Sequence, residues 1–223
     1  MLFRSILRAT DFGVQDVLTV DPSSGAVKYK PEMLPKPGVP IQFCPSPIGG
    51  KSWPSMSYSP ELQALFIPYL ATCAKMTFVD KGRKPGGGGG GGEAMTFTVH
   101  PKANGNPAVL SARDLNGQIL WEHRQRAPFV SATLTTASGL VFVADNARNL
   151  FAFDAKTGKV AWQMDLPTTG HGFPASYGVG GRQFIALPLG TGTPLDSFTQ
   201  QFVPEIPTMK PGNSLVVFAL PQQ

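Results

Sequence analysis

The chain has 223 residues, of which 42% are hydrophobic and 15% are charged. This length allows one large domain or two small ones, with enough apolar residues for a sizeable core. The net charge of +5 does not indicate a nucleic-acid partner, because the basic residues are scattered and their one cluster, between Lys75 and Lys84, is typical of a solvated loop.

Short segments rich in β-branched and aromatic residues recur along the chain, each bounded by turn residues, and such segments are typical of strands. We expect strands over Val14–Val20, Ala64–Pro68, Met95–His100, Val109–Asp114, Gly139–Ala144, Leu150–Asp154, Lys159–Gln163, Gln183–Leu187 and Ser214–Leu220. The chain contains 25 glycines and 22 prolines, which favour turns over long helices. No segment keeps a helical apolar period for three turns. The pattern predicts an all-β sandwich, barrel or propeller.

Seven consecutive glycines, Gly86–Gly92, interrupt this pattern. Such a run has no side chains to pack and loses much backbone entropy when it is ordered, so we expect a flexible surface loop over residues 81–93. A phosphate-binding loop is not indicated, because Glu-Ala-Met follows the run instead of Gly-Lys-Ser/Thr and a helix.

The two cysteines, Cys44 and Cys73, are too few for a disulfide framework or a zinc site. Either one bridge between them or two separate buried thiols fits the sequence. The histidines His100, His123 and His171 have no metal-ligand spacing, and we interpret each as a surface or packed side chain.

A motif recurs three times, at Asp21, Asp114 and Asp154. In each copy the Asp ends a strand, a glycine follows three or four residues later, and an aromatic residue comes four residues after that glycine. The last two copies are 40 residues apart, which is a spacing typical of propeller blades.

This motif is predicted to be structural. The Asp side chain can hydrogen-bond the turn backbone, and the glycine supplies the positive φ that the turn needs. A small residue on the preceding strand, such as Ala152, leaves room for a ring. We therefore expect Trp121 and Trp162 to pack between neighbouring blades, with Tyr29 as a weaker version, and we do not expect the motif's Asp residues to act as bases.

The stretch Ala152–Trp162 resembles the tryptophan-docking motif of the pyrroloquinoline quinone (PQQ)-dependent alcohol dehydrogenases, in which Ala-x-Asp-x-x-Thr-Gly-Lys precedes a Trp. The resemblance covers most of residues 14–221. Further stretches agree in the family's order, namely Gly49–Pro54 with Tyr58–Pro60 and Leu65–Pro68, Thr135–Phe142, Gly172–Tyr177 with Gly180–Ala186, and Ser214–Leu220.

The resemblance implies a partial β-propeller of about four four-stranded antiparallel blades, as a single domain over residues 1–223. Family members close an eight-bladed propeller from a chain more than twice as long, so this chain is expected to correspond to the C-terminal portion. The family's N-terminal propeller half is then a further expected partner. Sequence alone indicates no transmembrane segment, since no apolar run reaches about 18 residues, and no signal peptide.

The implied activity is that of a PQQ-dependent alcohol or aldehyde dehydrogenase. It would oxidise a primary alcohol and pass the electrons to a cytochrome-type acceptor in the periplasm. The family's catalytic Asp and the ligands of its calcium or lanthanide ion map upstream of Met1. No catalytic or metal-binding residue is therefore expected here, and Asp11, Asp16 and Asp145 match no such motif.

Three residues are candidates for binding PQQ. Ser52 stands at the position of a family Asn, Trp53 keeps the adjacent position, and Phe129 aligns with a late-blade aromatic residue. Ser is shorter than Asn, Phe has no N–H, and the family's basic residue near the quinone has no counterpart in Gly13–Val20. A pure packing role is the alternative for all three residues. At the level of the whole chain, a non-catalytic propeller module that binds protein or ligand, or an inactive truncated product, stays open.

Overall fold

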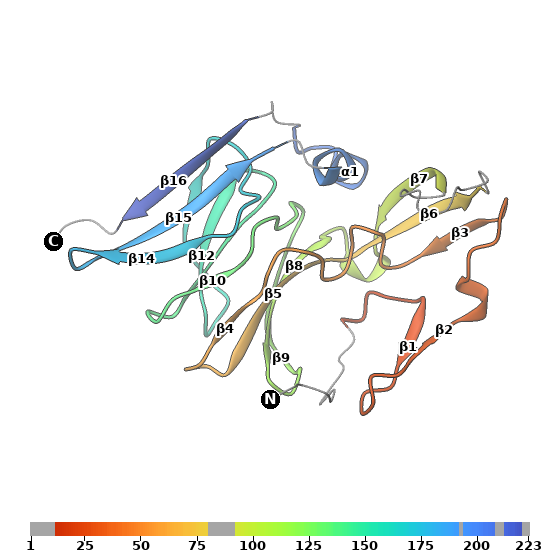
Figure 1. Ribbon diagram of the computed structural model, residues 1–223, viewed down its shortest axis with the longest axis horizontal. Coiled ribbons are helices and arrows are strands. Elements are labelled where there is room, and N and C mark those ends of the chain that lie inside the picture. Colours follow the sequence, from red (N-terminus) through yellow and green to blue (C-terminus); the bar gives the residue numbers. More distant parts are fainter. Residues whose placement is uncertain (1–11, 80–91, 192–193, 208–211, 220–223) are drawn as a thin grey trace, which may run out of the picture.

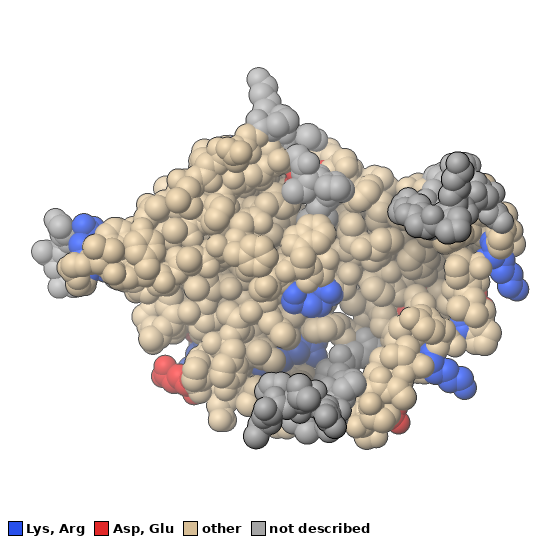
Figure 2. Space-filling model, viewed as in Figure 1, with Lys and Arg blue, Asp and Glu red and all other residues tan. Residues whose placement is uncertain are grey.

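The computed structural model describes residues 12–79, 92–191, 194–207 and 212–219. Its strands form antiparallel sheets that stand side by side (Figure 1). We call the successive sheets of the repeat blades I to IV. The charged side chains are scattered over the face in Figure 2 and do not gather into one patch there.

Two four-stranded sheets form the centre of the molecule. Blade II contains, in spatial order, β4 (Ser57–Ser59), β5 (Ala64–Leu70), β8 (Ala108–Asp114) and β9 (Ile119–Gln125). Blade III contains β10 (Leu134–Thr135), β11 (Leu140–Ala144), β12 (Asn149–Asp154) and β13 (Val160–Asp165). In each blade the chain enters at one edge and moves outward strand by strand, which is the arrangement of a propeller blade.

The two flanking blades have fewer strands in the described part of the chain. Blade IV contains β14 (Ala175–Val179), β15 (Arg182–Gly190) and β16 (Asn213–Ala219), and blade I contains β1 (Leu18–Val20) and β2 (Val27–Tyr29). The all-β partial propeller predicted from the sequence is therefore confirmed. Of the blades expected to be four-stranded, blades II and III have all four strands in the described part of the chain.

Two excursions leave the blades between their second and third strands. In blade II the chain continues from β5 into β6 (Thr72–Phe78) and β7 (Gly92–Val99), which pair with β3 (Pro40–Phe43) to form a side sheet. In blade IV the excursion carries helix α1 (Pro194–Phe202). Short 3-10 turns at Pro31–Met33 and Pro101–Ala103 complete the described elements.

The two excursions meet, and helix α1 lies between blade IV and strand β7 (Figure 1). Phe198 of the helix packs on Phe97 of β7, with ring centroids 4.8 Å apart. The backbone N–H of Phe97 donates to the side chain of Gln201 at 2.9 Å. Just beyond the helix, Glu205 forms a two-point ion pair with Arg126, which follows β9, at 2.6 and 3.0 Å.

Every strand expected from the sequence is present, with ends that differ by a few residues. Strands with mixed polar composition, such as β9, and short strands, such as β4 and β10, were not predicted. Helix α1 was not predicted either, because its nine residues are too few to show a helical period over three turns. Most of the glycine-rich segment lies outside the described residues, and its last part belongs to β7, so the loop predicted over 81–93 ends earlier than expected.

The main hydrophobic core lies between blades II and III. It joins buried side chains of β5 and β8, such as Phe66 and Leu110, to buried side chains of β11 and β12, such as Val143 and Phe153. Each of these four is no more than 1% exposed. Burying one such side chain contributes about 1.5–3 kcal/mol, so this interface between blades is a major source of stability.

The repeated motif builds the same turn in three blades. The Asp154 carboxylate accepts hydrogen bonds from the Thr157 N–H and hydroxyl, both at 2.7 Å, and these bonds lower the pKa of Asp154. Asp114 accepts from two backbone N–H groups of its own turn, both at 2.8 Å. The motif's Asp residues thus hold turns, as predicted. Gly158 adopts φ +71°, which favours glycine.

Trp121 docks blade II onto blade III. Its indole N–H donates to the carbonyl oxygen of Ala155 at 2.9 Å, and its ring lies against Phe66 and Phe153. A Cβ atom on Gly158 would approach the Trp121 ring to 2.6 Å, so the glycine is also required for this close approach. The docking role predicted for Trp121 is confirmed.

Trp162 occupies the equivalent place between blades III and IV but is less enclosed. Its side chain is 41% exposed, and its ring meets Phe218 of β16 with centroids 5.9 Å apart. The indole lines an apolar cleft of about 730 Å³ between the two blades, together with Ala152 and Ile185. The predicted position between blades is correct for Trp162, although the packing around it is much looser. Tyr29 on blade I is 56% exposed.

Candidate functional site

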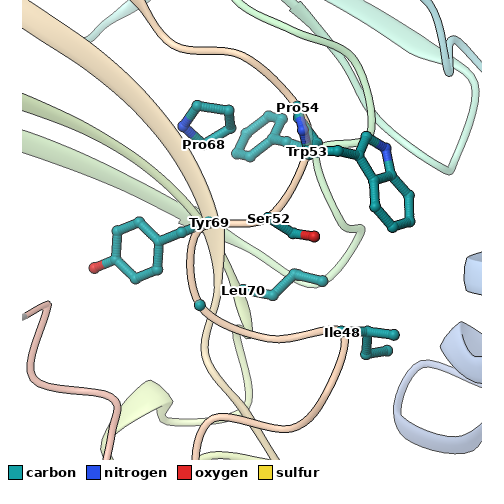
Figure 3. Close-up of a pocket in the computed structure, with 9 residues that line it drawn as sticks. Ile48, Ser52, Trp53, Pro54, Pro68, Tyr69 and Leu70 are labelled. Atoms are coloured by element: carbon teal, nitrogen blue, oxygen red, sulfur yellow. The ribbon is translucent and has the colours of Figure 1, made fainter.

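The structure brings together the three residues predicted to bind a cofactor. Ser52, Trp53 and Phe129 line one small pocket, with Pro68 and Leu70 of β5 among its other walls (Figure 3). The enclosed space is about 20 Å³, which is room for a single water molecule. Sequence separation hides this proximity, since Trp53 and Phe129 are 76 positions apart.

Backbone hydrogen bonds hold the segment that carries Ser52 and Trp53. Gly50 exchanges two hydrogen bonds with Leu70 of β5, at 2.7 and 3.1 Å. The carbonyl oxygen of Ser55 accepts from the Thr133 N–H at 2.9 Å. Ser52 and Trp53 are therefore fixed between blade II and the segment that enters blade III.

Lys51 holds the same segment from its other side. Its ammonium donates to the carbonyl oxygens of Ser52, at 2.7 Å, and Pro54. Partial burial lowers the pKa of Lys51. This cation beside the candidate site was not singled out from the sequence, where the family's basic residue was sought only in Gly13–Val20.

The three candidate residues differ in exposure. The Trp53 side chain is 52% exposed, and Figure 3 shows its indole directed away from the other labelled side chains. Phe129 is only 4% exposed and packs edge-on against Phe151, with ring centroids 6.3 Å apart. Phe129 is therefore part of the hydrophobic core, and its role in cofactor binding stays a prediction.

A buried carboxylate lies beside Phe129. Asp145, which pairs with Phe129 in an isolated β-bridge, is 1% exposed, and burial raises the pKa of its carboxyl group. It accepts hydrogen bonds from the Gln125 side chain at 3.0 Å and from the Asn149 N–H at 2.8 Å. These contacts hold the turn between β11 and β12, so Asp145 is a structural carboxylate of blade III.

His123 of β9 lies beneath this aromatic cluster, with its ring edge-on to Phe153 at a centroid distance of 4.9 Å. Burial lowers the pKa of His123, while a hydrogen bond with Gln125 opposes this effect. The unfolded chain therefore takes up the proton first as the pH falls. The His123 contribution to stability is present above its unfolded pKa of about 6.5 and is lost as the pH falls through that value toward the folded pKa.

As the pH is lowered from about 7 to about 5, we expect the free energy of unfolding to decrease less in the His123→Phe variant than in the parent chain. Urea unfolding at several pH values measures the two slopes. His100→Gln is the comparison variant: burial also lowers the pKa of His100, so this change should flatten the slope as well, without altering the aromatic cluster, since the His100 ring lies near the disulfide. Parallel slopes for His123→Phe and the parent chain would contradict this expectation.

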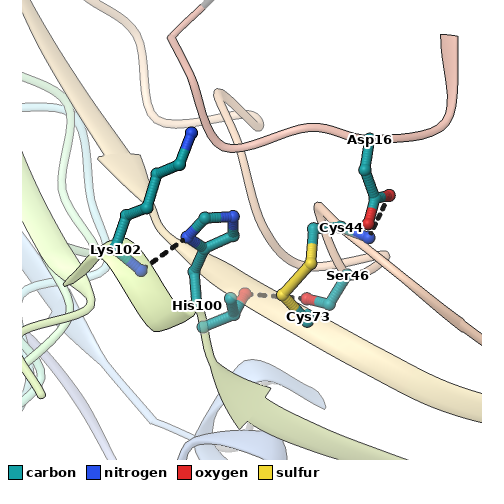
Figure 4. The surroundings of a disulfide bond; sticks show 7 residues. Asp16, Cys44, Ser46, Cys73, His100 and Lys102 are labelled. Carbon is teal, nitrogen blue, oxygen red and sulfur yellow. Dashed lines mark hydrogen bonds between the residues drawn. A yellow bond between two sulfur atoms is a disulfide. The ribbon is translucent and has the colours of Figure 1, made fainter. Parts of the chain in front are cut away.

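Cys44 and Cys73 form a disulfide, which settles the alternative that the sequence left open (Figure 4). The bridge ties the segment before Gly50 to strand β6. Asp16 is also held here, because its carboxylate accepts from the Cys44 N–H at 2.8 Å. The ring of His100 lies near both sulfur atoms, but sulfurs joined to each other offer no thiolate to a metal ion.

One buried hydrogen-bonded pair was missed by sequence reasoning. The Nε2 atom of His171, between β13 and β14, lies 2.9 Å from the Asp196 carboxylate in the first turn of α1. Their side chains are only 9% and 15% exposed. The two residues are 25 positions apart with strand β15 between them, so no local spacing could have revealed the pair.

The segments that enter blades II, III and IV are in direct contact. Three isolated bridges mark equivalent places at these entries, Gly50 with Leu70, Phe129 with Asp145, and Gly170 with Gly190. The N–H groups of Thr133 and Ala132 donate to the carbonyl oxygens of Ser55 and Gly172, at 2.9 and 3.3 Å. We call these three adjoining segments, residues 50–55, 129–133 and 169–172, the inner rim.

Comparison with known proteins shows similarity to one family of dehydrogenases. Residues 102–185 match the family model described as the β-propeller domain of glucose, ethanol and alcohol dehydrogenases. The chain is similar in sequence to quinoprotein alcohol dehydrogenases. It is 28% identical to quinoprotein alcohol dehydrogenase PedE of Pseudomonas putida, over 82% of this chain and 29% of PedE.

Two methanol dehydrogenases are also similar to the chain. The lanthanide-dependent methanol dehydrogenase of Methylacidiphilum fumariolicum is 29% identical over 73% of this chain and 27% of that enzyme. A solved europium-containing methanol dehydrogenase superposes with a TM-score of 0.77 at 25% identity, covering 88% of this chain and 38% of that one. The chain thus spans less than a third of the length of these curated relatives. No helix among the described residues is both long and apolar enough to cross a bilayer.

The inner rim presents an aromatic surface and hydrogen-bonding groups. Trp53 presents an exposed aromatic surface, Ser52 presents a hydroxyl, and the buried Nδ1 atom of His171 has no hydrogen-bond partner among the described residues. A tricyclic quinone is far larger than the space of about 20 Å³ beside Ser52 and Phe129, so these residues can flank such a group but do not enclose it.

Proposed function

We propose that this chain is the C-terminal part of the propeller of a PQQ-dependent alcohol or aldehyde dehydrogenase. The oxidoreductase would convert a primary alcohol to the carbonyl compound and pass the electrons to a cytochrome-type acceptor. The observation that carries the proposal is the meeting of Ser52, Trp53 and Phe129 at one pocket on the inner rim. The proposed reaction is that of the quinoprotein dehydrogenases to which the chain is similar.

In this proposal the chain contributes binding and orientation. The exposed indole of Trp53 supports the face of PQQ, the Ser52 hydroxyl hydrogen-bonds its polar edge, and Phe129 fixes the wall between them. When bound, PQQ supplies the two-electron redox chemistry, as cofactors generally do. The catalytic Asp and the ligands of a calcium or lanthanide ion are assigned to a part of the enzyme outside this chain.

The proposed location is the periplasm, with the N-terminal half of the propeller as a partner. The Cys44–Cys73 disulfide supports this location, because disulfides persist in oxidising compartments. The shape of blade IV supports the partner, since its three described strands leave the place of a fourth.

We expect PQQ to bind the chain in isothermal titration calorimetry. Trp53→Ala should weaken binding about tenfold, the effect of losing roughly 1.4 kcal/mol of aromatic contact. Ser52→Ala should weaken it about fivefold, the net value of one hydrogen bond. Trp162→Ala is the matched control, because this Trp is also partly exposed, at 41% against 52%, but lies between blades III and IV.

The burial of Phe129 and the small pocket favour a second candidate, a non-catalytic propeller module. The same titration separates the two functions. Absence of PQQ binding by the folded chain, or an equal loss of affinity in Trp53→Ala and Trp162→Ala, would count against a cofactor site at the inner rim.

A further inference from the structure

The connection between β13 and β14 carries unmet hydrogen-bonding capacity. The Oγ1 atom of Thr168 and the Nδ1 atom of His171 are both buried, and neither has a hydrogen-bond partner among the described residues. An unpaired buried polar atom is costly, and native proteins seldom keep one without a reason. Two such atoms within four residues indicate a place where a ligand completes the hydrogen bonding.

The orientation of the His171 ring is set by Asp196. A carboxylate only accepts hydrogen bonds, so the contact of 2.9 Å requires the hydrogen to be on Nε2. In the neutral ring Nδ1 then carries the free lone pair and acts as an acceptor. A side chain that is 9% exposed, tied to a helix of nine residues, cannot turn freely to exchange the two nitrogens.

His171 also belongs to the same ring of segments as the candidate cofactor residues. It follows Gly170, whose bridge to Gly190 is equivalent to the bridge between Phe129 and Asp145 in the preceding blade. Its neighbour Gly172 accepts a hydrogen bond from Ala132, three positions after Phe129. His171 is thus placed on the inner rim one blade beyond Phe129.

We propose that His171 is a further ligand-binding residue of the inner rim, oriented by Asp196, and that its Nδ1 atom accepts a hydrogen bond from the hydroxyl group of a bound alcohol. Asp196 is a positioning residue in this arrangement, because it acts through the histidine. The inference rests on the proposed function for the chemical class of the ligand, whereas the residue and its free acceptor atom come from the geometry.

The test is a long-range ¹H–¹⁵N correlation spectrum of the 223-residue chain with labelled histidine, recorded at a pH where the rings are neutral. We expect His171 to be in the Nε2–H tautomer. Addition of 1-butanol should shift its Nδ1 resonance upfield in a saturable way. The resonances of His100 and His123 should stay in place, since His100 Nδ1 already accepts from the Lys102 N–H at 3.1 Å.

Variants extend the test. Asp196→Asn should raise the population of the Nδ1–H tautomer and weaken the apparent affinity for the alcohol about fivefold, the equivalent of one net hydrogen bond. His100→Gln should leave the affinity unchanged. The wild-type spectrum decides the matter even where a variant fails to fold. A hydrogen found on Nδ1, or an Nδ1 resonance that the alcohol does not move, would overturn the inference.

The test of His171 can succeed or fail independently of the test of the proposed function. PQQ binding without a response of His171 would retain the cofactor site and reject the role of His171. A response of His171 to the alcohol without PQQ binding would retain His171 as a hydroxyl-binding residue and reject the quinoprotein function.

Discussion

Replacement of Trp121 by alanine should lower the free energy of unfolding by about 3 kcal/mol, the lower end of the range for truncation of a large core aromatic residue, because Trp121 is partly buried against the main core. The loss combines the hydrogen bond to Ala155, at 2.9 Å, with ring contacts to Phe66 and Phe153 across two blades. Trp162→Ala should cost only about 1 kcal/mol, because that indole is 41% exposed and borders an open cleft.

Urea unfolding of the two variants, monitored by far-ultraviolet circular dichroism, compares equivalent positions of the repeat. Trp121→Phe is the intermediate variant. It keeps a ring but loses the indole N–H and part of the packing, so we expect a loss between those of Trp121→Ala and the parent chain. Equal losses of unfolding free energy in Trp121→Ala and Trp162→Ala would show that the contact between blades II and III stabilises the chain no more than the contact between blades III and IV.

Removal of the disulfide should have the second largest effect. The Cys44–Cys73 bridge closes a loop with a sequence separation of 29, and loss of such a cross-link costs about 2–4 kcal/mol, chiefly through the greater freedom of the unfolded chain. A Cys44→Ser, Cys73→Ser double variant should therefore unfold at a lower urea concentration than the parent chain.

The control is the response to a thiol reductant. It should destabilise the parent chain by a similar amount and leave the double variant unchanged, which separates the loss of the cross-link from the cost of the new hydroxyls. The neighbouring hydrogen bond between the Ser46 and Thr72 hydroxyls, at 2.8 Å, stays available in both proteins. A double variant as stable as the parent chain would mean that the bridge constrains little.

The parts of the fold that sequence predicted are those specified by local chemistry. An Asp, a glycine with positive φ and a following aromatic residue lie within one turn and two strands, so the repeat around Asp114 and Asp154 was readable. In the structure Ala112 faces Trp121, and Ala152 faces Trp162, across the last two strands of each blade. The small residue opposite the ring was also anticipated.

The parts that sequence did not predict depend on long-range contacts. Helix α1 is short, and its stability comes from contacts with the side sheet rather than from its own apolar period. The His171–Asp196 pair forms only because β15 returns the chain to the inner rim. The candidate set Ser52, Trp53 and Phe129 came from resemblance alone, and no reasoning from residue types would have placed Phe129 beside Ser52.

The contact of α1 with the side sheet changes how the molecule is expected to come apart. In a repeat protein whose units contact only their neighbours, the unfolding of one unit depends little on distant units. Here the Arg126–Glu205 ion pair and the Phe97–Phe198 contact join an excursion of blade IV to elements around blade II. Because these contacts link blades II and IV independently of blade III, the three sheets should open as one cooperative unit rather than by fraying from one end.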